Sequence, residues 1–479
     1  MDPILYWNDV ALEANRVSHT SGRGEQVGPP RSARALAIVH LAMYDALAGV
    51  IDTPGPLPLY LSSLSALLPP EGASMEAAVG AAAHAALSAL YPSQKAFFDA
   101  RHHAAGISGA ATSMKDGHQF GLTVAAAILD DRAGDPGAGD DGYAASVHPG
   151  GHRVDPDNPE QGYHAPFWGS AKLFASSLRL GLGAPPALGS AEYMRAAREV
   201  RRKGIAASLM GTLPADVEGR SAHETLVGLF WGYDGARQLG TPPRLYNQIV
   251  RVVAQDRGNT PAKNARLFAF VNAAMADAGI LAWADKYKYD LWRPVVGIRE
   301  HDASMGPAAT GGHAISDDCD PYWLPLGAPS TNGLDAGSAA KNFTPPFPAY
   351  PSGHATFGAA ALHVTRLFYN VPVGDRSADT LFDGQTLISD ELNGVNRDNL
   401  GTVRPRHART FPKGLWEMIE ENGRSRVYLG VHWVFDAFAT RANGSMDLTK
   451  NVGGVRLGVD IAEDIFTAGN RKAPKKSSV

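Results

Sequence analysis

Three short segments of the chain carry cationic, imidazole and hydroxyl side chains in a pattern that suits one bound oxyanion. The first holds Lys286 and Arg293, the second is the Ser-Gly-His stretch at 352–354, and the third holds Arg426 and His432. Because unpaired buried cations are strongly unfavourable, such a cluster persists only around an anion that compensates it. A tetrahedral oxyanion, phosphate or vanadate, is the ligand that these residue types together predict.

Lys286 and Arg293 are seven residues apart and would lie on one face of a continuous helix. Such a pair usually faces solvent. Here Trp283 and Trp292 indicate a mostly buried setting instead, and Pro294 indicates a bend or a helix end.

Ser352, Gly353 and His354 open an apolar-periodic stretch that continues to residue 369. Ser is a preferred N-cap, and Gly lets an anion approach the free amides of a first helical turn. Alone, the three residues more often mark only a capped helix. Beside the other segments, His354 is predicted to act as a general acid or base, with an ordinary pKa near ~6.5.

Arg426 and His432 are six residues apart, which places them on different faces of an ideal helix. Gly430 lies between them, and a break in the helix there would turn His432 towards the side on which Arg426 lies. Asp436 follows His432 by four residues and is a candidate partner for one ring nitrogen.

Helical spacing of apolar residues dominates the rest of the chain, and β-branched alternation is scarce. Long helices with few strands predict helix-on-helix layers, in one or two bundles. The expected helices are 34–50, 75–91, 94–104, 110–129, 191–210, 223–231, 244–254, 265–283, 354–369, 415–429 and 432–440. Three irregular stretches lie between them, at 130–166, 300–350 and 371–412.

Composition is that of a soluble globular protein, with 479 residues, 44% hydrophobic residues and a net charge of −4. The slightly negative net charge does not indicate binding to nucleic acid or to an anionic membrane surface. Cys319 is the only cysteine, so neither an intrachain disulfide nor a thiolate metal site is expected. No secretory signal and no membrane span are recognised, which predicts a cytoplasmic location by default and leaves export by another route open. Monomer and homo-oligomer remain open.

The three segments resemble the tripartite motif shared by type 2 phosphatidic acid phosphatases, bacterial class A acid phosphatases and vanadium-dependent haloperoxidases. In this chain the motif is Lys286-x6-Arg293-Pro294, Pro351-Ser352-Gly353-His354 and Ser425-Arg426-x5-His432. Flanking sequences are similar to the fungal-type vanadium chloroperoxidases over nearly the whole chain, at 32–36, 240–248, 345–358, 391–398 and 430–433.

The resemblance implies an all-α fold of two four-helix bundles with long irregular loops and a vanadate site in the C-terminal bundle. We expect an N-terminal helical region at 1–165 and a C-terminal region at 166–479 that carries the oxyanion site. The two regions can equally form one compact unit.

The resemblance also assigns roles to the motif residues. His432 would bond to vanadium, and Lys286, Arg293 and Arg426 would neutralise the vanadate oxygens. His354 would act on the proton of incoming peroxide, and Lys286 would polarise a peroxide oxygen.

Further residues match supporting positions of the family. Ser352 and Gly353 would complete the hydrogen bonds to vanadate, and Asp234 would pair with Arg426. Trp283 and Phe347 would line the space where halide approaches.

The activity implied is oxidation of chloride and/or bromide by hydrogen peroxide to hypohalous acid, which halogenates small organic acceptors, with vanadate as the only cofactor. Phe347 stands where the bromide-preferring branch carries histidine, which favours chloride. The alternative is an acid phosphatase in which His432 is the nucleophile and His354 protonates the leaving alcohol. A protein that only sequesters an oxyanion is a weaker alternative.

The loop at 300–322 looks longer than the matching fungal loop and carries several His and Asp side chains that suggest a second metal site, among them His301, His313, Asp317, Asp318 and Asp320. We expect a solvated acidic loop instead, close enough to Arg293 in sequence to edge the entrance of the site.

Overall fold

The fold is all-α, as the sequence predicts, in a computed structural model that describes residues 2–51, 57–140, 142–312, 314–329, 342–398 and 401–479. The helices are α1 (Pro3–Ser18), α2 (Pro29–Ala48), α3 (Met75–Leu90), α4 (Lys95–Ala104), α5 (Ala111–Asp131), α6 (Ala191–Lys203), α7 (Ala222–Phe230), α8 (Pro242–Asp256), α9 (Pro261–Tyr289), α10 (Pro294–Arg299), α11 (Gly353–Phe368), α12 (Gly414–Tyr428), α13 (Val434–Ala437) and α14 (Gly454–Ala468).

The strands of the described residues are very short and form two antiparallel pairs. β1 (Leu387–Ile388) pairs with β2 (Ala408–Arg409), with Leu387 opposite Arg409. β3 (Ala439–Thr440) pairs with β4 (Met446–Asp447), with Ala439 opposite Asp447.

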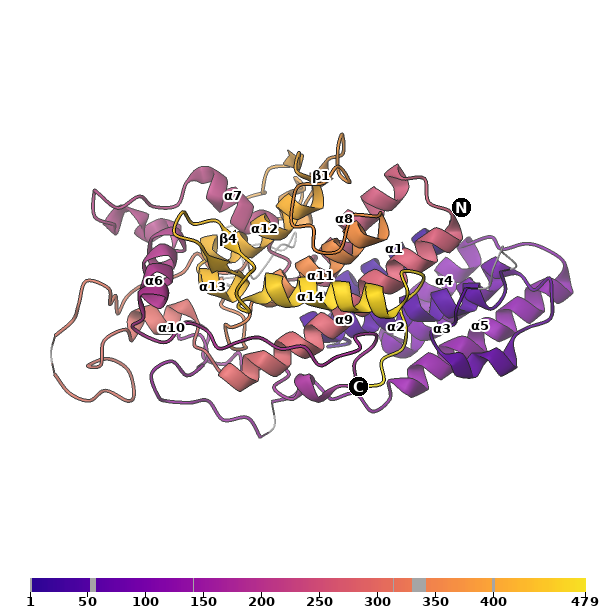
Figure 1. The fold of residues 1–479 in the computed structure, drawn as a ribbon, viewed down its shortest axis with the longest axis horizontal. Helices are drawn as coiled ribbons and strands as arrows, with labels where there is room; N and C mark the ends of the chain where they lie inside the picture. Colours follow the sequence, from indigo (N-terminus) through magenta and orange to yellow (C-terminus); the bar gives the residue numbers. More distant parts are fainter. Residues whose placement is uncertain (1, 52–56, 141, 313, 330–341, 399–400) are drawn as a thin grey trace.

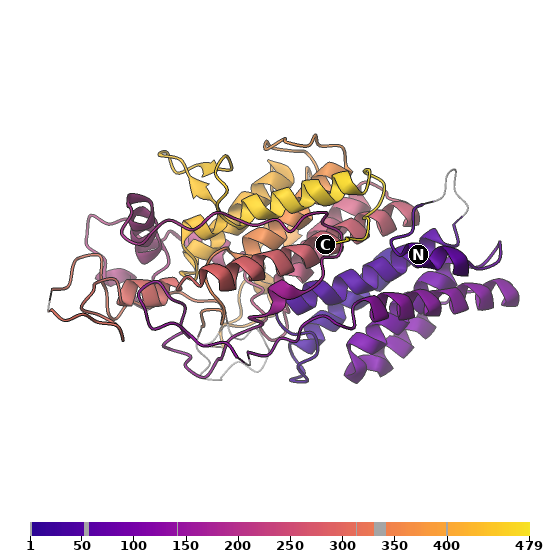
Figure 2. The same cartoon turned by 60° about the horizontal axis from the view of Figure 1, so that its bottom comes forward.

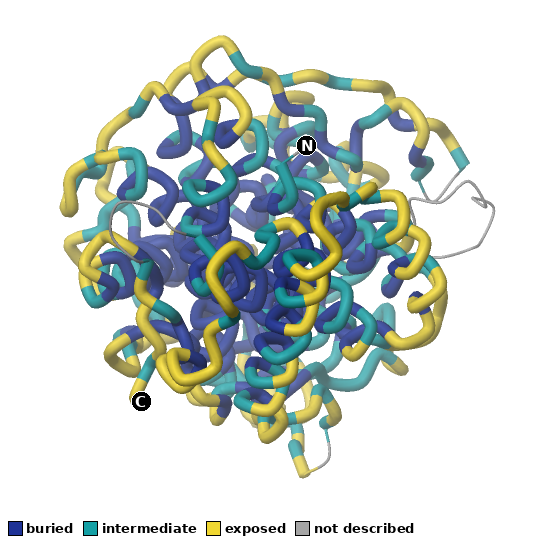
Figure 3. Tube along the Cα trace, turned by 90° about the vertical axis from the view of Figure 1, so that its right-hand side faces the viewer, coloured by how far each residue is buried: buried dark blue, intermediate teal, exposed yellow. Residues whose placement is uncertain are grey.

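Helices α2 to α5 gather at one end of an elongated molecule, and α12 and α13 lie towards the other (Figures 1 and 2). Helix α9 joins the two ends, because it packs on α2 on one side and on α11 and α14 on another. The buried apolar side chains form one cluster that extends from Ile4 in α1 to Ala473 after α14. Figure 3 shows this buried interior surrounded by exposed loops. The division into two bundles remains a prediction.

Helix α9 begins at the Thr260-Pro261 pair, where the Thr260 side chain accepts the backbone N–H of Lys263, and it ends before Asp290, which is left-handed at φ +48°. By length and composition alone this helix could cross a bilayer, which the sequence analysis did not recognise. Because 94% of its most apolar window is buried inside the protein, α9 is the core helix of a soluble fold.

The C-terminal helices begin and end beside the motif residues. Arg293 is the N-cap of α10, so Pro294 begins a helix, and the helix end that was predicted there lies earlier, at Tyr289. Gly430 has φ +73° and follows the end of α12, which confirms the predicted break before His432. Of the helix expected at 432–440 only Val434–Ala437 is helical, because Trp433 is the N-cap and Phe438 is extended and leads into β3.

Candidate active site

A cavity of about 420 Å³ lies where the loop between α1 and α2 meets the C-terminal helices. Seven of the residues singled out from the sequence line it: Asp234, Trp283, Phe347, Gly353, His354, Arg426 and His432. Lys286, Arg293 and Ser352 do not line the cavity but are fully buried next to residues that do.

His432 is held by one partner on each ring nitrogen. Nη1 of Arg293 lies 2.9 Å from Nε2 of His432, and Oδ2 of Asp436 lies 2.7 Å from Nδ1. Because a guanidinium can only donate, Nε2 is the accepting nitrogen and Nδ1–H donates to Asp436. Burial and the nearby Arg293 and Lys286 cations lower the pKa of His432 well below its ordinary value, so the ring is neutral with its lone pair on Nε2.

Arg426 is fixed by a buried ion pair with Asp234. Its Nη2 donates to Oδ1 of Asp234 at 2.6 Å, and both side chains are almost wholly buried. The pairing of these two residues, which the sequence suggested only through resemblance, is therefore present in the structure.

His354 stands at the first turn of α11, with Nε2 2.6 Å from the carbonyl oxygen of Gly232 and 3.9 Å from Oδ1 of Asp234. A carbonyl only accepts, so Nε2 carries the proton and Nδ1 has the free lone pair. Burial, with the Arg426 charge, lowers the pKa of His354 to about 3. The imidazole is therefore neutral and can accept a proton.

Lys286 is oriented differently from the other cations. Its ammonium donates to three backbone carbonyls, those of Pro348 (2.7 Å), Ala349 (3.1 Å) and Pro351 (2.5 Å). The charge also lies 5.0 Å from the ring centroid of Phe347. Lys286 thus fixes the turn that precedes the Ser-Gly-His segment, and it must exchange a carbonyl before it can contact an oxyanion.

Ser352 and Gly353 begin α11 as the sequence predicted. The Ser352 side chain accepts the Ala355 amide at 3.4 Å, and the Ser352 amide donates to the backbone carbonyl of Asp436 at 2.8 Å. This second bond joins the start of α11 to α13. A side chain at Gly353 would lie 3.3 Å from the Trp283 ring, so glycine leaves the first-turn amides accessible.

Several polar atoms in this region lack partners. Three buried guanidinium nitrogens have none among the described residues: Nη2 of Arg293, and Nε and Nη1 of Arg426. Oδ2 of Asp234 and Oδ1 of Asp436 are also unpaired there. Unsatisfied buried donors of this kind are costly unless another group meets them. A multiply charged anion with several acceptor oxygens fits this donor set.

Trp283 and Phe347 form an aromatic wall beside these cations. Their ring centroids are 4.8 Å apart, and Arg293 lies 5.0 Å from the Phe347 centroid. The wall keeps one side of the cavity apolar where the positive charges converge.

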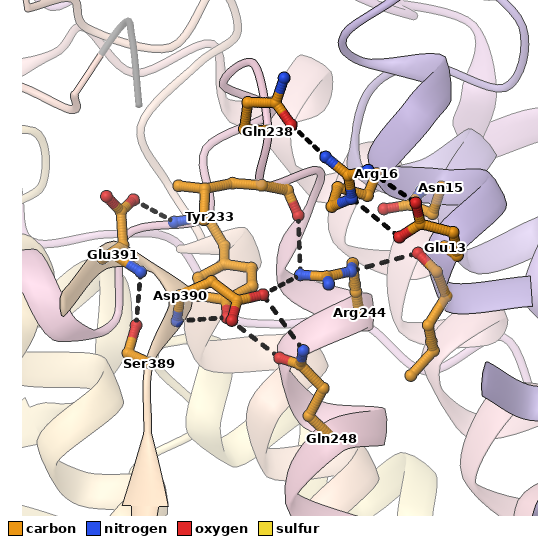
Figure 4. A network of polar contacts seen from close by, with 12 residues as sticks. Glu13, Asn15, Arg16, Tyr233, Gln238, Arg244, Gln248, Ser389, Asp390 and Glu391 are labelled. Carbon is orange, nitrogen blue, oxygen red and sulfur yellow. Dashed lines mark hydrogen bonds and ion pairs between the residues drawn. The ribbon is translucent and has the colours of Figure 1, made fainter. Parts of the chain in front are cut away.

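A polar network behind the cavity holds the segment that carries Gly232 and Asp234 (Figure 4). The Tyr233 backbone N–H donates to Glu391 at 3.0 Å, and the Tyr233 hydroxyl donates to Gln248 at 3.0 Å. Arg244 pairs with Asp390 at 2.5 Å in the same network, which extends to Arg16 of α1.

The loop at 300–322 lies against α6 and away from the cavity, and none of its described residues lines it. Asp318 makes a two-pronged ion pair with Arg198 at 2.8 and 2.7 Å. The expectation that this loop edges the entrance was wrong. No group of three or more His, Cys, Asp or Glu side chains in the described ranges is arranged to hold a metal ion, and His313 lies outside those ranges.

Sequence reasoning missed the part of the cavity that comes from the region expected at 1–165. His19, Gly28 and His164 line it, and an added side chain at Gly28 would collide with the His164 ring. His164 falls in a stretch that reads only as irregular, so no periodicity or spacing connects it to the motif.

Comparisons with known proteins show which proteins this chain is similar to. The chain matches the family model of the vanadium chloroperoxidase N-terminal domain over residues 1–164 and that of the VCPO second helical-bundle domain over 266–453. It is 36% identical over 583 aligned residues to the vanadium chloroperoxidase of Curvularia inaequalis, covering 98% of this chain and 90% of that one.

Two solved structures share the fold. A bacterial vanadium-dependent iodoperoxidase superposes with a TM-score of 0.67 at 20% identity, covering 98% of this chain and 97% of that one. A bacterial vanadium-dependent chloroperoxidase in its holo form gives a TM-score of 0.61 at 16% identity, with 95% of each chain covered.

Proposed function

The chain belongs to the vanadium chloroperoxidase family, and from that premise we propose which of its residues carry out the reaction. The protein is an enzyme that oxidises halide with hydrogen peroxide, and its cofactor is vanadate. The acid phosphatase alternative is not favoured, because the similarity covers both domains and not the motif alone.

His432, Arg293, Arg426, Ser352 and Gly353 would hold vanadate. The observation that supports this most directly is the set of three guanidinium nitrogens that lack a partner among the described residues, in the same buried cluster as His432, whose Nε2 accepts from Arg293. At ~4 Å and an effective dielectric near 20, one cation–anion pair is worth about 4 kcal/mol, which offsets the burial of these charges. When bound, vanadate supplies a Lewis acid that activates peroxide without changing its own oxidation state.

His354 would be the base that accepts the proton of incoming peroxide at Nδ1. Its Nε2–H bond to Gly232 fixes the tautomer, and its low pKa keeps the ring neutral before the substrate arrives. Asp234 would act through Arg426, by holding the guanidinium in place.

Lys286 would contribute positive charge behind the aromatic wall and exchange one carbonyl for an oxygen of the bound group. An ammonium is suited to this exchange, because its three donors rotate freely. Trp283 and Phe347 would form the apolar side of the halide position, which favours chloride, with bromide also oxidised.

We also propose a cytoplasmic enzyme that acts without nucleic acid or membrane partners, consistent with its net charge of −4. A domain division near residue 165 would fit as well, with cavity residues drawn from both sides of it.

The direct test is chlorination of monochlorodimedone by protein freed of vanadate, with and without added orthovanadate, at saturating peroxide and chloride. We expect substrate absorbance to be lost only with vanadate. Hydrolysis of p-nitrophenyl phosphate that vanadate inhibits, with no oxidation of chloride or bromide, would contradict the proposal.

A further inference from the structure

His354 is held at its backbone as well as at its ring. Its carbonyl oxygen accepts from the Tyr246 hydroxyl at 3.0 Å and from Nδ2 of Asn422 at 2.8 Å. Tyr246 belongs to α8 and Asn422 to α12, and α11 packs against both helices (Figure 1). A helical carbonyl ordinarily accepts from the amide four residues later, so these two side-chain donors are additional to the helix.

The two donor side chains also contact each other. The Tyr246 hydroxyl lies 3.1 Å from Oδ1 of Asn422, so its single proton has two acceptors within reach. Both side chains are fully buried. Because a buried polar group that loses its partner is unfavourable, the hydroxyl, the amide and the carbonyl hold one another in one arrangement.

Gly358 provides the space for this arrangement. It lies one turn after His354 in α11, where a β-carbon would be 2.4 Å from Nδ2 of Asn422 and 3.2 Å from the Tyr246 ring. Any side chain at this position would therefore displace the Asn422 amide. Glycine is otherwise unfavourable in a helix interior, so its presence here agrees with a specific need for the contact at the His354 carbonyl.

Asn422 connects His354 to the helix that carries Arg426. Asn422 and Arg426 are four residues apart in α12 and lie on the same face of that helix. Arg426 pairs with Asp234, and Oδ1 of Asp234 lies 3.9 Å from Nε2 of His354. The proposed base and a guanidinium of the oxyanion site are thus linked twice, through Asp234 at the ring and through Asn422 at the backbone.

We propose that Asn422 and Tyr246 are positioning residues for His354, and that they hold its Nδ1 where it can accept the peroxide proton. This inference rests on the proposed function, in which His354 is the base. A catalytic group has to be held within about 0.5 Å of its productive position. The bond from Nε2 to Gly232 alone would let the ring pivot, and fixing the backbone carbonyl removes that freedom.

Peroxide kinetics test the proposal in variants that each remove one donor. We expect kcat/KM for peroxide at saturating vanadate to fall about threefold in Tyr246→Phe and about tenfold in Asn422→Leu. Vanadate retention in equilibrium dialysis should stay within about twofold, because neither residue would hold vanadate. Unchanged kcat/KM in both variants, or an equal loss of vanadate, would overturn the proposal. Tyr246→Phe keeps the buried ring and carries the test where Asn422→Leu does not fold.

Thr365→Val is the matched control. The buried Thr365 hydroxyl donates to the Ala361 carbonyl at 2.8 Å, so this variant also removes a side-chain donor from a carbonyl of α11. Thr365 lies about three turns from His354 and outside the cavity lining, so kcat/KM for peroxide should change less than about twofold. An equal loss in Thr365→Val and Tyr246→Phe would mean that the stability of α11 alone sets the activity, and would overturn the proposal.

A double-variant cycle decides whether the two residues act through His354. In a His354→Ala background, Tyr246→Phe and Asn422→Leu should lower the residual kcat/KM by less than about twofold, because the group that they position is absent. The full loss in that background would overturn the proposal. Gly358→Ala should repeat the effect of Asn422→Leu in the parent and add nothing in the His354→Ala background.

Crystal structures of the vanadate-free proteins separate this inference from the proposed function. In Asn422→Leu we expect Nδ1 of His354 to move by more than about 0.5 Å, while Arg293, Arg426 and His432 keep their parent positions. An unmoved His354 would overturn the positioning role even if kcat/KM fell. A parent protein that oxidises no halide, with His354 displaced in the variant, would contradict the proposed function alone.

Discussion

The buried carboxylate of Glu391 accepts the backbone N–H of Tyr233 at 3.0 Å (Figure 4). Tyr233 is left-handed at φ +53°, a conformation that a non-glycine residue keeps only where its surroundings hold it. Its two neighbours in sequence are Gly232, whose carbonyl accepts from His354, and Asp234, which pairs with Arg426. Glu391 therefore fixes a segment that orients two candidate active-site residues.

Replacing Glu391 should impair the enzyme without touching the oxyanion residues. In Glu391→Ala the Tyr233 amide loses its acceptor, and we expect kcat/KM for peroxide at saturating vanadate to fall about tenfold, or ~1.4 kcal/mol. Glu391→Gln keeps an acceptor oxygen and should recover most of the loss. Equal impairment in both variants would point to the ion pair with Arg404 instead, which joins the same carboxylate at 2.7 Å.

The same carboxylate should make stability depend on pH. Burial raises the pKa of Glu391 from 4.5 to about 7 in the folded state. The folded protein then holds this proton more tightly than the unfolded chain, so the contribution of Glu391 to stability is fully present below pH 4.5 and is lost as pH rises to about 7. Relative to Glu391→Gln, the parent should lose up to about 3 kcal/mol over that window. Urea unfolding at several pH values measures this, and parallel curves for the two proteins would contradict it.

His432 and His354 should separate vanadate binding from peroxide activation. His432→Ala removes the imidazole whose Nε2 lone pair faces the oxyanion residues, so vanadate retention in equilibrium dialysis should fall at least a hundredfold. His354→Ala should keep vanadate within about threefold and lower peroxide kcat/KM by ~10²-fold, the usual scale for a general base. Vanadate loss in the second variant with the first unaffected would reverse the two assignments.

Lys286→Met should weaken both folding and vanadate binding. Three buried carbonyls lose a charged donor, which we expect to cost about 3 kcal/mol of unfolding free energy. The lost positive charge should also reduce vanadate affinity at least tenfold. Lys288→Met is the matched control, because Lys288 is exposed on the same helix and should change neither quantity. Normal vanadate affinity in Lys286→Met would mean that the ammonium only stabilises the turn before Ser352 and does not contribute to vanadate binding.

Local patterns predicted much of the helical framework. The stretch at 265–283 carries continuous apolar spacing and lies within α9, and the glycine break before His432 was visible as a single residue. The patterns failed at a helix end that apolar spacing does not mark. The stretch 432–440 satisfies helical spacing, yet Phe438 is extended at φ −165° because the chain turns there into β3.

Only the site residues that belong to the three motif segments could be predicted from the sequence. Arg293, Arg426 and His432 carry charge or lone pairs whose spacing suggested an oxyanion. Glu391 and His164 act through contacts between segments distant in sequence, at Tyr233 and at Gly28. Such contacts follow from tertiary packing, so neither composition nor periodicity contains them.

Phe347 offers the last prediction, which concerns the choice of halide. Its ring lies 4.8 Å from that of Trp283 and 5.0 Å from both the Lys286 ammonium and the Arg293 guanidinium, so it keeps an apolar surface against two cations. Phe347→His would place a polar ring there and favour water beside the halide position. We expect kcat/KM for chloride to fall at least tenfold and that for bromide to fall less than threefold, because bromide is easier to oxidise. Phe343→His, further along the same cavity, is the control. A parallel loss for both halides in Phe347→His would show that the ring maintains the site and does not select the halide.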